Sequence, residues 1–265
     1  MQKPLPLSVC MISGAEASRI NRALESIAGW AGEIIVVLNE QVNDGTQEIA
    51  LRHGAKVIRE PWRGFIAQKN SCADKATLPW LLNLDADEVV PAELATEIAA
   101  VVSAPQSAHA AYEFPRCTFY SGRWIRHGDW YPDRVLRLWR QGAGRWAGED
   151  PHARLEVTGS VGRLRSDLLH FSNESIARQI EKIAPYHSDF VKRRVAIGGA
   201  AGWIELVFRP GWRFLRAYFL RRGFLDGWQG FYIAALGSFS TLTRYALLRE
   251  ARENSLDSTG PEPRR

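Results

Sequence analysis

Short apolar runs alternate with segments of helical spacing over residues 5–103 of the chain. The β-branched run Glu33–Leu38 is typical of a buried parallel strand. After Glu16, apolar residues recur every three or four positions, which favours an amphipathic helix. The pattern predicts strands at Leu5–Ile12, Glu33–Leu38, Lys56–Ile58 and Trp80–Leu84. It predicts helices after Glu16, from Thr46 to Gly54, from Phe65 to Ala76, and from Pro91.

This alternation of strands and helices predicts an α/β fold with a parallel, doubly wound sheet. Ligands of such sheets bind beyond the carboxyl ends of the strands. Asp85 follows the run Trp80–Leu84 directly, so we expect it at such an end.

The pattern changes after Tyr112 to short strands between loops rich in Gly, Trp, Arg and His. Strands are expected at Val135–Trp139, Leu155–Val157 and Leu168–Phe171, and a helix is expected after Ser172. Glycines near residue 198 mark a boundary, followed by an aromatic helical segment. We therefore predict a division into residues 1–197, 198–252 and a disordered tail, 253–265.

Composition narrows the class of protein. The chain has 265 residues, 46% of them hydrophobic, and a formal net charge of +5. Disorder of most of the chain is excluded, and a charge this small does not indicate a nucleic-acid partner. The three cysteines form no CxxC motif, which argues against a disulfide scaffold or structural zinc. We expect neither a signal peptide at the N-terminus nor a spanning helix.

Asp85 and Asp87 are separated by one residue, so on an extended chain their side chains point into the same cleft. Two convergent carboxylates predict a site for Mg²⁺ or Mn²⁺ whose remaining ligands are substrate phosphates. The alternative is that these acids only end a strand and cap the helix at Pro91.

Further motifs accompany these acids in a fixed order. With them, the chain resembles family 2 glycosyltransferases of the GT-A fold, and within them the subgroup that adds sugars to the lipopolysaccharide inner core. The resemblance implies a mostly parallel mixed sheet flanked by helices, with a C-terminal amphipathic helical extension. It also divides residues 1–197 into a nucleotide-sugar half, 1–104, and an acceptor half, 105–197. The motifs that carry it are Glu33–Leu38, Asn43–Thr46, Trp62–Phe65, Gln68–Asn70, Trp80–Glu88, Arg137–Arg140, Pro151–His152, Leu168–His170 and Gly223–Gly227.

The resemblance implies a role for each matching donor-site residue. Asp85 would contact the ribose or the donor sugar, Asp87 would hold the metal with Asp85 beside it, and Lys69 would approach the donor. Family members usually carry an aspartate after the position of Val37, within a V-D-x-x-S-x-D-G-T run. This chain departs from that run, so Asn39 or Glu40 is expected to take over the base contact, with Asp44 in the same loop.

Inverting transfer requires a carboxylate that takes the proton of the attacking hydroxyl. In many relatives this acid follows a histidine, but Ala153 occupies that place here. Asp150 or Glu149 is the expected base, with Asp150 preferred because the following proline fixes its direction. Asp133 and His152 are expected to bind the acceptor.

Residues 203–232 combine ten aromatic side chains with interleaved arginines. A helix starting at Pro210 would place Trp212, Leu215 and Phe219 on one face, with Arg213 and Arg216 beside it. Such a segment can lie in a membrane interface. The alternative is that its aromatic residues pack on the catalytic domain.

We therefore predict a metal-dependent, inverting glycosyltransferase. It would move a sugar from a nucleotide donor, expected to be UDP-linked, to a lipid-linked saccharide of lipopolysaccharide core or another cell-envelope glycan. Its expected place is the cytoplasmic face of the membrane, as a peripheral protein. Two alternatives stay open from the sequence: a sugar-nucleotide nucleotidyltransferase, and an inactive membrane-associated adaptor.

Overall fold

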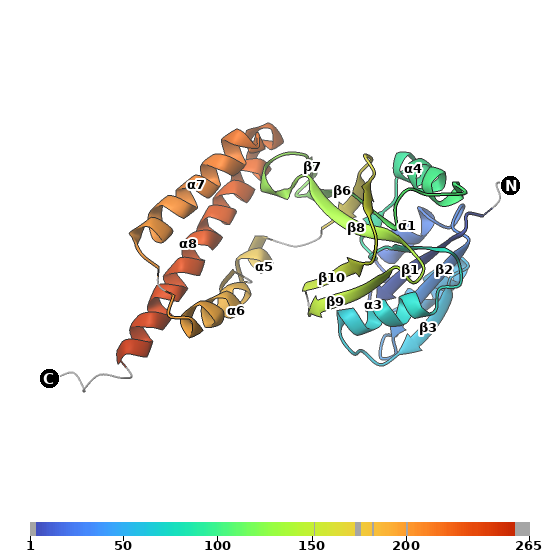
Figure 1. Cartoon of the computed structure of the whole chain (residues 1–265), viewed down its shortest axis with the longest axis horizontal. Coiled ribbons are helices and arrows are strands. Elements are labelled where there is room, and N and C mark those ends of the chain that lie inside the picture. Colours follow the sequence, from blue (N-terminus) through green and yellow to red (C-terminus); the bar gives the residue numbers. More distant parts are fainter. Residues whose placement is uncertain (1–3, 151, 173–175, 182, 200, 258–265) are drawn as a thin grey trace. The chain divides into compact units, whose positions relative to one another are not determined.

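The computed structural model describes residues 4–150, 152–172, 176–181, 183–199 and 201–257. These residues form two compact units. The first contains the chain up to Cys117 together with Asp133–Phe171. The second contains Thr118–Pro132 and the chain from Ser172 onward. Figure 1 shows the elements of each unit.

A mixed sheet is the framework of the first unit. Its parallel part has the order β3-β2-β1-β4, and β8 then pairs antiparallel with β4. The sheet continues through β6, β12 and β5, while β7 and β11 pair with β6. Strands β9 and β10 form a separate antiparallel hairpin. The bounds are β1 (Leu7–Ser13), β2 (Glu33–Asn39), β3 (Lys56–Glu60), β4 (Trp80–Asn83), β5 (Glu88–Val89), β6 (Ala111–Tyr120), β7 (Arg123–Ile125), β8 (Asp133–Arg140), β9 (Gly144–Glu149), β10 (His152–Val157), β11 (Val161–Arg163) and β12 (Leu168–Phe171).

Alternate side chains of the central strands enter two hydrophobic cores, one on each face of the sheet. Val9 and Met11 of β1 lie in one core with residues of α1 (Ile20–Glu25) and α4 (Ala92–Ser103). Cys10 lies in the other, with residues of α3 (Phe65–Asp74) and the β9–β10 hairpin. Helix α2 (Thr46–Arg52) contributes Ala50 to the first core. Both faces of β1 are thus buried, which explains its continuous apolar sequence.

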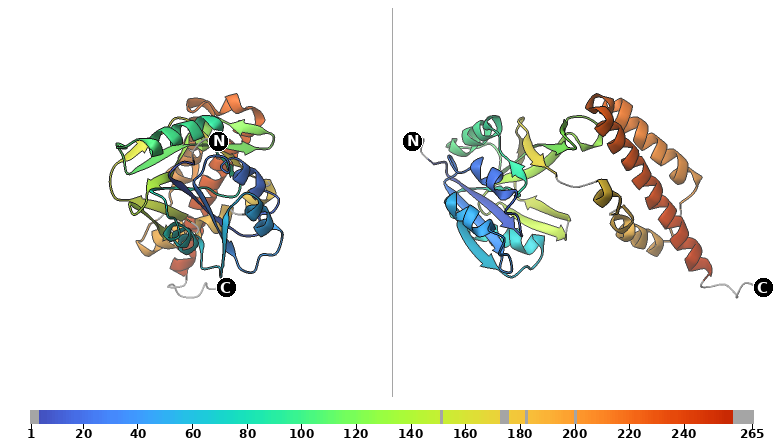
Figure 2. Two further views of the ribbon diagram at one scale, coloured as in Figure 1. Left: turned by 90° about the vertical axis from the view of Figure 1, so that its right-hand side faces the viewer. Right: turned by 180° about the vertical axis from the view of Figure 1, so that it is seen from behind.

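The second unit is mainly helical. Helices α7 (Arg209–Leu215) and α8 (Gly227–Asp257) run side by side, as Figure 2 shows, and α6 (Ile183–Ala196) also packs on α8. No helix in the described part of the chain is long and apolar enough to cross a membrane. The remaining elements are α5 (Ile176–Glu181), η1 (Gly128–Trp130), η2 (Ile204–Phe208), η3 (Arg216–Leu220) and η4 (Gly223–Asp226).

The predicted fold class, a mixed sheet flanked by helices with a C-terminal helical extension, is confirmed. The long strand β6 was not expected, because Pro115, Arg116 and Thr118 interrupt its apolar pattern. Its pairing with β8 carries a register shift between Tyr112 and Glu113. Helix α8 continues to Asp257, into the predicted tail, whose residues 258–265 lie outside the described part. The predicted division at residues 197 and 252 stays a prediction.

Candidate active site

A cleft of about 670 Å³ opens in the first unit at the carboxyl ends of β1 and β4. Ser13 ends β1 in the cleft wall, and the segment Asp85–Asp87 follows β4 into it. The strands are paired in parallel, with Cys10 opposite Asn83, so their ends meet at one edge. The β9–β10 hairpin supplies another part of the wall through Trp146 and Leu155.

Asp85 lies between two cations in this cleft. Its Oδ1 accepts a hydrogen bond from Lys69 Nζ at 3.1 Å, and its Oδ2 accepts one from Arg137 Nη2 at 2.6 Å. Partial burial in the cleft would raise the pKa of Asp85, but the positive charges of Arg137 and Lys69 hold that pKa well below its ordinary value. Burial lowers the pKa of Lys69, and the charge of Asp85 opposes this effect. Asp85 is therefore ionised.

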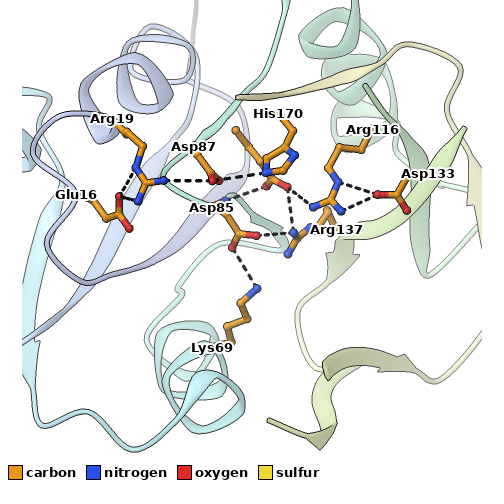
Figure 3. Close-up of polar contacts among 10 residues, drawn as sticks. Glu16, Arg19, Lys69, Asp85, Asp87, Arg116, Asp133, Arg137 and His170 are labelled. Atoms are coloured by element: carbon orange, nitrogen blue, oxygen red, sulfur yellow. Dashed lines mark hydrogen bonds and ion pairs between the residues drawn. The ribbon is translucent and has the colours of Figure 1, made fainter. Parts of the chain in front are cut away.

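The ion pairs continue across the sheet as a chain of alternating charge. Arg137 also donates to the fully buried Glu88, at 3.1 Å, and Glu88 accepts from Arg116 at 3.2 Å. Arg116 in turn donates through Nε and Nη2 to one oxygen of Asp133, at 2.9 and 2.6 Å. Figure 3 shows this succession from Lys69 to Asp133. It fixes the side chains of three strand segments relative to one another.

Asp87 faces a different set of partners. Its Oδ2 lies 3.5 Å from Nε2 of His170, at the end of β12, and 3.8 Å from Nη1 of Arg19. Arg19 also pairs with Glu16, and Figure 3 shows its guanidinium between the two acids. Asp87 and His170 therefore meet from two strand ends that are far apart in the sequence.

These donors fit a divalent metal only in part. Asp87 and His170 offer one oxygen and one nitrogen close together, and magnesium typically uses one or two carboxylates and takes its other ligands from phosphates. Both oxygens of Asp85 already accept hydrogen bonds from cations, so a metal there would compete with Lys69 and Arg137. Among the described residues, no cluster of three or more acidic, His or Cys side chains has metal-site geometry.

Trp146 on β9 forms the floor beside Lys69. The Lys69 ammonium lies 4.5 Å from the centre of its ring system. The side chain of Asn70 binds both backbone polar groups of Trp146. Its Nδ2 donates to the Trp146 carbonyl, and its Oδ1 accepts from the Trp146 N–H, each at 2.9 Å. The buried indole N–H of Trp146 has no hydrogen-bond partner among the described residues.

Asp150 lies at the tip of the β9–β10 hairpin, next to the N-terminus of α3. Its Oδ1 accepts a hydrogen bond from the backbone N–H of Ile66 at 3.1 Å. Gly64 permits this approach, because a Cβ at that position would overlap the Asp150 carboxylate. Asp150 therefore caps α3 from another element, where its negative charge is favourable.

The other residues predicted to act on the acceptor side have fewer contacts with the cleft. Glu149 is exposed at the same hairpin tip. Ala153, at the place of the usual acid, lines the cleft without a titratable group. Asp133 does not line the cleft, but it contacts Arg116, which does. The side chain of His152 is not among those that the structure describes.

The predicted base-binding loop does not reach the cleft lining. Asp44 accepts from Thr46 and from the Ala17 backbone, so it orders the start of α2 and the loop before α1. These hydrogen bonds, the one from Thr46 first, lower the pKa of Asp44. Asn39 ends β2 and accepts from the Gln41 N–H. Glu40 is exposed, and Arg59 binds its carbonyl. The roles of these residues remain predictions.

The sequence did not predict a place in the site for Arg19, Glu88 or Arg116. It also did not predict that Arg137 pairs with Asp85 and Glu88. Arg137 and Glu88 both belong to motifs that carry the family resemblance, but the resemblance gave neither of them a role. His170 belongs to the motif Leu168–His170, but the sequence does not indicate that it lies beside Asp87. Nothing in the local pattern around Arg19 or Arg116 indicates a site, because both reach it through the tertiary fold.

Comparisons with known proteins identify the family of the chain. Residues 8–168 match the family described as Glycosyl transferase family 2. An uncharacterized glycosyltransferase of Rickettsia typhi is 31% identical over 254 residues, which cover 92% of this chain and 87% of the relative. The lipopolysaccharide core biosynthesis glycosyltransferase LpsC of Rhizobium meliloti is 28% identical over 268 residues, covering 96% of this chain and 97% of LpsC.

A solved structure confirms the fold. The structure of S. aureus TarS 1-349 in complex with UDP-GlcNAc superposes with a TM-score of 0.51 at 13% identity, covering 95% of this chain and 92% of TarS. The predicted GT-A fold is thereby confirmed. Since the family match spans more than half of the sequence, the chain belongs to glycosyl transferase family 2 and is a glycosyltransferase.

Proposed function

We propose that the protein transfers a sugar, with inversion, from a nucleotide-sugar donor to a lipid-linked saccharide acceptor in the synthesis of a cell-envelope glycan. The expected donor nucleotide is UDP, and the expected product belongs to lipopolysaccharide core. Similarity to LpsC over nearly the whole of both chains supports the cell-envelope assignment.

The arrangement of charge in the cleft carries this proposal. Acids that suit a divalent cation, Asp87 above all, lie beside cations that suit a diphosphate, Lys69 and Arg19. A nucleoside diphosphate with its metal needs both kinds of group at once. The volume of about 670 Å³ lies within the range usual for small-molecule sites.

Mg²⁺ or Mn²⁺ would be held by Asp87 and His170 together with donor phosphates, and would neutralise charge on the leaving diphosphate. Asp85 would then act through its hydrogen bonds. Ionised and fixed by Arg137, it orients Lys69 toward the donor.

Asp150 is our proposed base, with Glu149 as its alternative. A base must lie within hydrogen-bond reach of the attacking hydroxyl. The hairpin tip that carries both acids adjoins Ala153 and Arg154 in the cleft wall. In the present structure Asp150 bonds to α3, and its second carboxylate oxygen remains to accept a proton.

Exposed apolar residues in the second unit support a membrane-bound acceptor. Phe208, Trp212, Leu215 and Phe219 follow one another at helical spacing, and each is about half exposed or more (70, 58, 49 and 53%). Exposed apolar stripes of this kind mark interaction surfaces, and aromatic ones suit a membrane interface. We place the protein on the cytoplasmic face of the membrane, held there by residues 203–232.

Three arginines of this segment form ion pairs within the second unit. Arg213, Arg216 and Arg221 all pair with Asp129, so they are not simply available to lipid. Substituting them together by glutamate would disrupt the second unit itself. The apolar stripe is therefore the better target for a test of membrane binding.

Asp87→Ala tests the proposal. It should abolish metal-dependent turnover of a nucleotide sugar, because the cleft loses its best-placed metal ligand. Glu93→Ala, an exposed acid on α4, is the control and should keep the wild-type rate. A panel of UDP- and GDP-sugars assayed with Mg²⁺, with Mn²⁺ and with chelator identifies the donor. Normal metal-dependent rates in Asp87→Ala would refute the mechanism.

Calorimetry separates an active enzyme from an inactive adaptor. An enzyme of this kind should bind UDP more tightly with Mn²⁺ than without it, and Asp87→Ala should remove the difference. An adaptor would show no metal-dependent affinity for any nucleotide. Such a result would leave the family membership intact and remove the proposed reaction.

A further inference from the structure

Two exposed aromatic side chains, Trp62 and Phe65, line the cleft of the first unit. They are 42% and 43% exposed, whereas the other aromatic residues described in that unit are buried or partly buried. Both belong to a motif that carries the family resemblance, but the resemblance gives neither of them a role. Exposed aromatic groups inside a ligand cleft mark a contact with a ligand rather than with the core.

The two rings hold each other in a fixed orientation. Their centroids are 5.0 Å apart and their planes stand at 88°, which is an edge-to-face arrangement. Such a contact restricts the rotamers of both side chains before a ligand binds. Little conformational entropy is then lost on binding, so the exposed ring surface is preorganised.

The backbone that carries the two rings is held at both ends. Glu60, at the end of β3, pairs with Arg63 at 2.9 Å. Asp150, at the tip of the β9–β10 hairpin, accepts from the backbone N–H of Ile66 at 3.1 Å. Gly64 has a φ of +95°, in the region that favours glycine, and a Cβ there would overlap the Asp150 carboxylate. The segment is therefore fixed beside Asp150.

This position indicates which part of the substrates the aromatic pair meets. Asp150 is the proposed base, and a base must lie within hydrogen-bond reach of the attacking hydroxyl. The sugar that carries this hydroxyl would then lie next to Trp62 and Phe65. The donor diphosphate suits the cations of the cleft instead, because the face of an aromatic ring is negative.

A pyranose ring is complementary to such a surface. The C–H groups on one face of a pyranose carry small positive partial charges, which the negative face of an aromatic ring attracts. Contact between the two also removes apolar area from water. The hydroxyl groups at the edge of the sugar ring stay free for hydrogen bonds. An exposed aromatic pair therefore favours a cyclic sugar.

We propose that Trp62 and Phe65 form a stacking platform for the acceptor sugar, which presents its hydroxyl to Asp150. This inference rests on the proposed function and names the contact that recognises a pyranose acceptor. The platform binds the C–H face of the sugar non-covalently, and it neither makes nor breaks a bond. Binding of the donor nucleotide does not depend on it.

Saturation-transfer NMR with the full chain tests the platform, because it requires no turnover. The probes are the methyl pyranosides of glucose, galactose and mannose, and the wild type should bind at least one of them. Trp62→Ala should weaken that binding at least about fivefold, because it loses the ring face and its apolar contact. Trp62→Leu, which is apolar but has no ring, should lose nearly as much. Trp62→Phe keeps a ring and should stay within about twofold of wild type.

Trp228→Ala is the matched control, since Trp228 is 55% exposed but does not line the cleft. It should bind the pyranoside as the wild type does. Phe65→Ala should also lose affinity, and it serves as the second variant if Trp62→Ala melts early. Equal binding by the Trp62, Phe65 and Trp228 variants would overturn the platform. Failure of the wild type to bind any of the three pyranosides would overturn it as well.

Calorimetry with UDP and Mn²⁺ distinguishes the acceptor sugar from the nucleotide base, which could also stack on an aromatic ring. Trp62→Ala should bind UDP with wild-type affinity. A loss of about fivefold or more would assign the rings to the base and overturn the proposal. The proposed reaction is judged separately, by the metal-dependent nucleotide affinity of the wild type and of Asp87→Ala. Normal metal-dependent affinity together with normal pyranoside binding by Trp62→Ala rejects only the platform.

Discussion

Arg137 is the residue on which the charge chain of the cleft depends most. It is 6% exposed and bridges Asp85 to the fully buried Glu88. Among the described cations, Arg137→Met would leave Glu88 paired with Arg116 and Asp85 paired with Lys69. Removing one partner of a buried ion pair lowers the free energy of unfolding by about 3–5 kcal/mol. Urea denaturation should show this loss.

Arg134→Met provides the comparison, since Arg134 lies on the same strand but is exposed. Its free energy of unfolding should change by no more than about 0.5 kcal/mol. If Arg137→Met were as stable as Arg134→Met, the ion pairs of the cleft would contribute nothing to folding. The cleft would then owe its shape to the hydrophobic cores alone.

Asp150 has a structural contact and a proposed chemical role, and Asp150→Asn separates them. Asparagine keeps an acceptor for the Ile66 N–H and is as good a helix cap as aspartate. It cannot take a proton from the acceptor hydroxyl. We therefore expect an unchanged melting temperature and a kcat at least about 100-fold lower.

Glu149→Gln is the matched variant at the neighbouring position. It should keep a rate near wild type if Asp150 is the base. A large loss in Glu149→Gln with a normal rate in Asp150→Asn would transfer the role to Glu149. Normal rates in both variants would exclude the hairpin tip as the source of the base.

The candidate site could be predicted from sequence only where it is local in sequence. Asp85 and Asp87 follow a recognisable strand, and the structure brings both to the cleft with Lys69. Arg19, from the loop before α1, and His170, from β12, are both far from Asp87 in the sequence. No period or spacing relates His170 to Asp87, because their proximity arises from the pairing of β12 with β5.

At the scale of elements, α3 connects the parts of the cleft. Asn70 attaches it to β9, Asp150 caps its first turn, and Glu60 at the end of β3 binds Ser71 and Lys75. Lys69, which contacts Asp85, lies on this helix. Its placement therefore depends on contacts from three other elements.

Glu60 makes one of these contacts dependent on pH. Its hydrogen bond with Lys75 is the main cause that lowers its pKa in the folded protein. The folded state therefore binds the Glu60 proton less readily than the unfolded state. The stabilisation is complete above the unfolded pKa, about 4.3, and is lost as pH falls through the lower folded value.

Glu60→Gln should therefore unfold more easily than wild type at neutral pH, and the difference should shrink as the pH falls below about 4. Denaturant titrations at several pH values measure this. Glu250→Gln, an exposed acid on α8, is the control and should show no such convergence. A Glu60→Gln deficit that stayed constant to low pH would contradict the assigned role of its charge.

The parallel part of the sheet and its helices could be predicted because β1, β2 and β4 are buried on both faces, which leaves continuous apolar runs. Strand β6 could not be predicted in this way. It carries Arg116 toward the cleft, and its pairing is set by β8 rather than by its own pattern.

At the scale of the whole molecule, the proposed membrane association rests on the apolar stripe of the second unit. Burial of a large apolar side chain contributes about 1.5–3 kcal/mol, so two aromatic residues account for a large part of membrane affinity. Trp212→Ser combined with Phe219→Ser should reduce recovery with floating vesicles at least about tenfold, whatever their charge. Melting temperature should be unchanged, since both side chains are more than half exposed.

The control for this test carries the same number of changes in the first unit. Leu51→Ser combined with Val161→Ser removes two exposed apolar side chains outside the stripe, and vesicle binding should stay at the wild-type level. Equal losses in both double variants would mean that exposed apolar area anywhere on the chain drives binding. If neither variant lost binding, the stripe would not be the membrane contact, and the assignment of residues 203–232 to the lipid interface would be wrong.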